Sequence, residues 1–132
     1  MKVFLSYSAA DKDLATDLIS RLRAEGFEVG QDEEVGPGDN WALAIGKALE
    51  ESDAMIVLLS PDAAKSEWVE REIEYALTSP RYKNRLLPVL VKPTRRIPWI
   101  LRKLPLIRLY ENPVDGTDRV VDEVRQLAKA TG

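Results

Sequence analysis

The stretch AMIVLL at residues 54–59 is apolar at every position and ends in Ser60 and Pro61. An uninterrupted apolar run of this length is typical of a β-strand that is buried on both faces. Strands of that kind occur in parallel sheets that carry helices on both sides, because the crossover connections cover the two faces. The stretch therefore predicts an α/β domain.

Strand and helix patterns alternate on both sides of this stretch. A helix is indicated where Leu14, Leu18 and Leu22 recur four residues apart, ahead of Gly26. In a later helix that ends near Thr78, the spacing predicts a core-facing stripe. That stripe consists of Val69, Ile73, Ala76 and Leu77. We expect strands at Lys2–Tyr7, Phe27–Val29, Ala54–Leu59, Leu86–Val91 and Leu106–Leu109, and further helices at Asp11–Glu25, Trp41–Ser52 and Val120–Ala130.

The repeated β-α pattern predicts an open five-stranded parallel sheet with helices on both faces. For five strands the commonest order is 2-1-3-4-5, the flavodoxin-like arrangement, and we expect the whole chain, residues 1–132, to form one such domain. Ligands bind such folds at the carboxyl ends of the first and third strands. The informative positions are therefore residues 6–8 and Ser60 with its neighbours.

The composition excludes several kinds of chemistry. The 132 residues include no histidine and no cysteine. Serine-histidine triads, thiol nucleophiles, disulfides and metal sites built on these two residues are therefore excluded, and we expect no metal. A dinucleotide-binding glycine motif and a phosphate loop are also absent. No apolar run approaches the roughly 20 residues that span a bilayer, and no signal-peptide pattern opens the chain, so we expect a cytoplasmic protein with no membrane partner.

Charge is unevenly distributed along the chain, although the net charge is only −3. Residues 1–80 carry 17 acidic and 7 basic side chains, whereas residues 81–108 carry 9 basic side chains and no acidic one. The basic stretch has few aromatic residues for stacking on bases, so we expect no nucleic-acid partner. A solvated face, or a face that docks an acidic protein surface, is the preferred interpretation.

Four motifs follow one another along the chain: VFLSYS at 3–8, GPGDNW at 36–41, LSP at 59–61 and SEWVEREI at 66–73. A further motif, IPW, stands at residues 97–99 in a weakened form. Together these motifs resemble the TIR (Toll/interleukin-1 receptor) domain, particularly its bacterial branch. The resemblance covers essentially the whole chain.

The resemblance implies cleavage of NAD⁺ at the bond between nicotinamide and ribose, with NAD⁺ as substrate and no resident cofactor. It places Glu72 at the position of the family's catalytic glutamate. Trp68 lies four residues earlier and therefore on the same helix stripe, where an aromatic face can hold a flat ring. Glu70 and Glu74 are the competing carboxylates, and a glutamate on so acidic a helix is more often simply solvated.

Further substrate contacts are expected in the loops at the sheet's carboxyl edge. Hydroxyl groups there can contact ribose or diphosphate, although they can equally satisfy backbone groups at strand ends. Two glycines would let a mobile loop cover the site. At one of these positions the chain departs from the pattern of some NAD-cleaving relatives: Ser8 stands where they carry an arginine. The candidate substrate-binding residues are Ser6, Tyr7, Ser8, Gly36, Gly38, Ser60 and Trp68.

Two classes of function remain open from the sequence, ahead of a third and less favoured one, a nucleotide-binding sensor without catalysis. The first is an NAD⁺ nucleosidase or an ADP-ribosyl cyclase making a cyclic ADP-ribose isomer, as in bacterial TIR proteins of antiphage immunity. The second is a non-catalytic scaffold that binds other TIR domains, or a mimic that disturbs host signalling. Because the acidic and basic segments are complementary, self-association, including head-to-tail filaments, is expected for either class.

Overall fold

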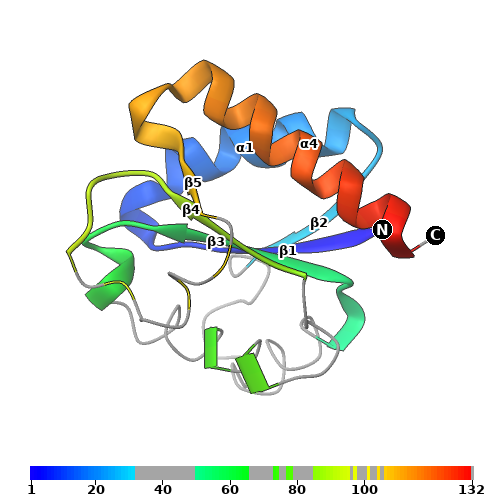
Figure 1. Ribbon diagram of the computed structural model, residues 1–132, viewed down its shortest axis with the longest axis horizontal. Helices are drawn as coiled ribbons and strands as arrows, with labels where there is room; N and C mark the ends of the chain where they lie inside the picture. The colour runs from blue at the N-terminus through cyan, green and yellow to red at the C-terminus, as the bar shows by residue number, and fades with distance from the viewer. Residues whose placement is uncertain are drawn as a thin grey trace.

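The protein forms one five-stranded parallel sheet within the part of the chain that the structure describes (Figure 1). This computed structural model describes residues 1–31, 50–65, 73–74, 77–78, 85–95, 97, 101, 104 and 106–131. The strand order is β2-β1-β3-β4-β5 and each neighbouring pair is parallel, which confirms the flavodoxin-like prediction. The strands are β1 (Lys2–Ser6), β2 (Glu28–Gln31), β3 (Ala54–Leu59), β4 (Leu86–Leu90) and β5 (Ile107–Arg108).

Two long helices, α1 (Lys12–Ala24) and α4 (Pro113–Thr131), lie side by side on one face of this sheet (Figure 1). Two ion pairs join them, one between Arg21 and Asp118 and one between Arg125 and Glu25. No helix among the described residues is long and apolar enough to cross a membrane. Single 3₁₀ turns occur at η1 (Ala9–Asp11), η3 (Ala63–Lys65) and η6 (Leu109–Glu111).

Apolar side chains cover both faces of the sheet, which explains the uninterrupted run at 54–59. Successive residues of a strand point to opposite faces. Accordingly, Ile56 and Leu58 pack in a first core cluster with residues of α1 and α4, whereas Met55 and Val57 belong to a second cluster on the other face. All six residues of β3 are buried.

The observed elements differ from the predicted ones mainly at the C-terminal end. Helix α4 begins at Pro113, not at Val120, because proline suits the first position of a helix, where its missing N–H has no partner to lose. Strand β5 is limited to two residues, and Leu109 already belongs to the turn η6. Leu77 was expected on the core face but is 37% exposed, whereas Ile73 is buried as expected. The predicted helix 41–52 lies largely outside the described residues.

A glycine brings the first turns of α4 against η6. A Cβ atom added at Gly116 would lie only 2.9 Å from the Leu109 Cα and 3.1 Å from its Cγ. Contacts below 3.0 Å are essentially absent between real Cβ atoms and backbone, so a larger residue requires the backbone to move. The close contact therefore accounts for a glycine at position 116 inside a helix, where it costs about 1 kcal/mol relative to alanine.

The amino ends of β1 and β3 are joined by Asp53. The backbone N–H of Lys2 donates to Asp53 Oδ2 at 2.9 Å, and the backbone N–H of Asp53 donates to the Lys2 carbonyl at 2.7 Å. The ammonium group of Lys2 lies 3.6 Å from the Glu51 carboxylate. Asp53 is partly exposed, so water also reaches this end of the sheet.

Candidate functional site

The loops that follow β1 and β3 meet at the carboxyl edge of the sheet. The two strands are neighbours, and Ser6, the last residue of β1, pairs in register with Val57. After β1 the chain continues through Ser8, and after β3 it continues through Ser60. This is the edge at which doubly wound sheets bind ligands.

Ser6, Tyr7 and Ser8 differ in their exposure. Ser6 is fully buried and Tyr7 is 6% exposed, with its side chain in the first core cluster. Ser8 is partly exposed. Its carbonyl accepts a hydrogen bond from the Asp11 backbone N–H at 2.8 Å, and its hydroxyl oxygen lies 3.4 Å from the Ala10 nitrogen. Ser8 is therefore the member of this group that a ligand in the crevice can reach directly.

A buried aspartate lies between the two loops. The side chain of Asp11 is only 2% exposed. Its Oδ2 accepts a hydrogen bond from the Ser60 hydroxyl at 2.5 Å, and its Oδ1 lies 3.7 Å from the Lys92 ammonium nitrogen. Lys92 follows β4, so this carboxylate joins the carboxyl ends of β1, β3 and β4. We call these three residues the Asp11 network.

Hydrogen bonding explains why the carboxylate can be buried here. A buried charge is costly unless it is paired and hydrogen-bonded. The Ser60 hydroxyl donates to Asp11 and accepts the Ala63 backbone N–H at 3.0 Å, so it links the carboxylate to the turn η3. Because both functions of this hydroxyl are used, Ser60 fixes the shape of the crevice.

Asp11 and Lys92 were not among the residues selected from the sequence. Asp11 was expected only to begin a helix, and it does precede α1, but its side chain makes no capping hydrogen bond. The available signal was an acidic residue shortly after the first strand, close to the edge where ligands bind. Lys92 carries no comparable signal, since it is one of nine basic residues between 81 and 108.

The remaining candidates, Glu72, Trp68, Gly36 and Gly38, lie outside the described residues. The next residue along the chain, Ile73, is helical and 7% exposed. It belongs to the second core cluster with Leu59 and Ala63, which stand at the carboxyl end of β3. Ile73, the last residue of the SEWVEREI motif, is thus anchored near the crevice.

Glu74, one of the competing carboxylates, is helical and exposed. Its backbone carbonyl accepts a hydrogen bond from the Thr78 hydroxyl at 3.0 Å. Within the described part of the chain, no three metal-binding side chains come together as a metal site would require.

The parallel sheet of order 2-1-3-4-5, with its crevice at the ends of β1 and β3, defines an α/β domain of the flavodoxin-like class. The sequence profile of the TIR domain family matches residues 3–127. The chain therefore belongs to the TIR domain family. This confirms the resemblance drawn from its motifs.

Two relatives of known activity are similar to this chain. The 2′ cyclic ADP-D-ribose synthase BtTIR of Bacteroides thetaiotaomicron is 34% identical across 94% of this chain and 45% of that protein. The NAD(+) hydrolase PdTIR of Paracoccus denitrificans is 36% identical across 66% of this chain and 30% of that protein. The chain thus spans less than half the length of either relative.

The fold is also similar to that of a solved animal TIR domain. The crystal structure of the TIR domain of the Toll-related receptor TRR-2 from Hydra magnipapillata aligns with a TM-score of 0.69 and 24% identity. The alignment covers 79% of this chain and 80% of that domain. At this level of identity the similarity supports the fold alone.

Proposed function

We propose that this TIR domain cleaves NAD⁺ at the bond joining nicotinamide to ribose. The observation that carries the proposal is its 34–36% identity to relatives named as a cyclic ADP-ribose synthase and an NAD⁺ hydrolase. The two activities break the same bond and differ in whether water or a nucleophilic group of the same substrate attacks the ribose carbon.

The composition is compatible with this chemistry. The nicotinamide ring of NAD⁺ is cationic and leaves as a neutral molecule, so no acid has to protonate the leaving group. This differs from ordinary glycoside hydrolysis, which uses two carboxyl groups. One carboxylate that stabilises the positive charge developing on the ribose is sufficient, and a chain without histidine can provide it.

We assign that role to Glu72, and ring stacking to Trp68. Ser8 is assigned a contact with ribose or diphosphate at the edge of the crevice. Ser6, Tyr7 and Ser60 stay candidate substrate-binding residues, and the burial of Ser6 and Ser60 points to support of the loops as their main contribution. Gly36 and Gly38 are proposed to let the loop that contains them close over the substrate.

The test is to incubate the full chain with NAD⁺ and separate the products, comparing wild type with Glu72→Gln and Glu74→Gln. Glu74 is an exposed glutamate two residues further along the chain and provides a matched control. We expect Glu72→Gln to lower turnover by about a hundredfold or more, since it removes the charge that stabilises the transition state. Glu74→Gln should retain turnover.

Nicotinamide with ADP-ribose would indicate hydrolysis, and nicotinamide with a cyclic isomer would indicate cyclisation. Equal turnover by wild type and Glu72→Gln would refute the assignment of Glu72. Absence of nicotinamide release by concentrated wild-type protein would refute the enzymatic proposal itself.

Self-association is proposed as a second property, supported by the separation of charge between residues 1–80 and 81–108. Oppositely charged surfaces on one chain favour head-to-tail contacts, which salt weakens. Sedimentation at several salt concentrations tests this: assembly should decrease as salt rises, and a monomer at low salt and high concentration would contradict it. If assembly occurs without NAD⁺ cleavage, the scaffold interpretation gains support.

Cytoplasmic action in bacterial antiphage defence is proposed on the family resemblance alone. Comparing phage growth in cells that express wild type or Glu72→Gln tests it.

A further inference from the structure

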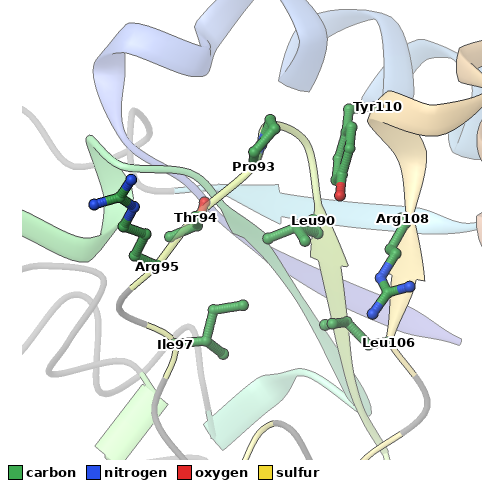
Figure 2. Close-up of a pocket in the computed structure, with 8 residues that line it drawn as sticks. All are labelled: Leu90, Pro93, Thr94, Arg95, Ile97, Leu106, Arg108 and Tyr110. Atoms are coloured by element: carbon green, nitrogen blue, oxygen red, sulfur yellow. The ribbon is translucent and has the colours of Figure 1, made fainter.

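A pocket with a volume of about 610 Å³ lies beyond the crevice, at the carboxyl ends of β4 and β5 (Figure 2). This volume is within the range of small-molecule sites. It is separate from the hydroxyl groups of the crevice, although the turn after β4 borders both: Lys92 belongs to the Asp11 network, and the next three residues, 93–95, line the pocket.

The inner surface of the pocket is apolar. Leu90 is 5% exposed, and Ile97, Leu106 and Tyr110 are partly buried against the second core cluster. In Figure 2 these side chains surround an open central space, with the Tyr110 ring standing at one side. Such a surface suits the flat, weakly polar body of a ligand.

Cationic groups stand at the rim. Arg108 and the Tyr110 hydroxyl lie on the same side of the pocket, and Arg95 lies on the opposite side (Figure 2). No acidic side chain is among the eight lining residues that the structure describes, in accord with the surplus of bases between 81 and 108. The pocket therefore presents positive charge beside an apolar floor.

The guanidinium group of Arg108 can exchange its present partner for a ligand. Its partner among the described residues is the Glu111 carboxylate, 3.9 Å away, and the two side chains are 60% and 58% exposed. Exposed ion pairs of this kind contribute little free energy. A phosphate, by contrast, accepts two parallel N–H bonds from a guanidinium and binds it more strongly.

We propose that this pocket binds a small organic phosphate with a flat ring, of which a mononucleotide is the simplest example. Arg108 and the Tyr110 hydroxyl hold the phosphate, Arg95 adds positive charge from the opposite rim, and the ring lies over Leu90 and Ile97. The site is independent of the cleavage reaction proposed for the crevice.

The experiment is a titration of the full ¹⁵N-labelled chain with AMP, adenosine and inorganic phosphate, followed through backbone amide signals. We expect AMP to shift the signals of Leu90, Arg108 and Tyr110, to bind at least about tenfold more tightly than adenosine or phosphate, and to bind more weakly as salt rises. Shifts confined to Ser8 and Ser60 would overturn the proposal by placing AMP in the crevice.

Two variants and one control assign the contact. Arg108→Gln should weaken AMP binding about tenfold or more, and Arg108→Lys should recover part of the loss because it keeps the charge without the fork of N–H donors. Arg119→Gln removes an exposed arginine of α4 outside the pocket and should leave binding unchanged. Equal binding of AMP and adenosine, equal binding of AMP and phosphate, or unchanged AMP affinity in Arg108→Gln would overturn the proposal.

Discussion

The two ends of the β1–β3 pair each carry an aspartate that reaches from one strand to the other, and the two carboxylates are held differently. At the amino ends, Asp53 is partly exposed and accepts a backbone N–H of Lys2 at 2.9 Å. At the carboxyl ends, Asp11 is 2% exposed; it accepts a hydrogen bond from the Ser60 hydroxyl at 2.5 Å and forms an ion pair with the Lys92 ammonium at 3.7 Å.

The two aspartates have different roles: Asp53 joins two strand ends of the sheet, whereas Asp11 fixes the shape of the candidate site. A carboxylate that accepts a strand-end N–H can remain in contact with water, because the backbone geometry already defines the contact. A carboxylate removed from water depends on specific side chains from other loops, which it holds in place in return. Substitution of Asp11 should therefore lower the free energy of unfolding more than substitution of Asp53.

The largest effect is expected for Asp11→Ala. This change leaves the Ser60 hydroxyl without its buried acceptor, so we expect the free energy of unfolding to fall by about 2–3 kcal/mol. Urea denaturation measures the loss. A double-mutant cycle with Ser60→Ala should show coupling between the two positions, because each substitution removes the same hydrogen bond. Additive losses would contradict the direct contact.

An intermediate effect is expected for Asp53→Ala. The backbone N–H of Lys2 loses its carboxylate acceptor but can bind water at this partly exposed end, so we expect a loss of about 1 kcal/mol. The same denaturation experiment provides the comparison. A loss equal to that of Asp11→Ala would abolish the proposed difference between the two ends.

The smallest effect on stability is expected for Lys92→Gln. The lysine side chain is 56% exposed and its contact with Asp11 is long, so its removal should cost less than about 1 kcal/mol. Thermal unfolding at low and high salt measures it, and the difference from wild type should shrink as salt rises. A loss as large as that of Asp11→Ala would show that the ammonium group, rather than Ser60, holds the buried carboxylate.

The strands could be predicted from the sequence because their apolar runs are long and uninterrupted. The stretch at 54–59 was located to the residue. The alternating pattern predicted the parallel sheet, and the strand order was predicted as the commonest one for five strands. The start of α4 was misplaced because Gly116 weakens the local helix pattern. The reason for a glycine at this position is its close packing on Leu109, which is a tertiary contact. Likewise, helical spacing could not reveal that Leu77 stays exposed.

The candidate site was only partly predictable. Ser60 was found because it follows the strongest strand, and the topology brings it close to the loop after β1. The partnership of Asp11 with Ser60 joins positions 49 residues apart, and no local pattern encodes it. Burial of Ser6 likewise depends on a strand distant in sequence, β3, where Val57 is its register partner.

The close approach of Gly116 to Leu109 also has a consequence for the pocket beyond β4. Leu109 stands between Arg108 and Tyr110, which both line that pocket. Gly116, a residue of α4 that is not among the pocket's lining residues, therefore influences the position of Arg108 at the rim of the pocket. An alanine at position 116 would push the Leu109 backbone and carry its two neighbours with it. The shape of this pocket can thus be altered by a substitution in a helix that contributes none of its eight described lining residues.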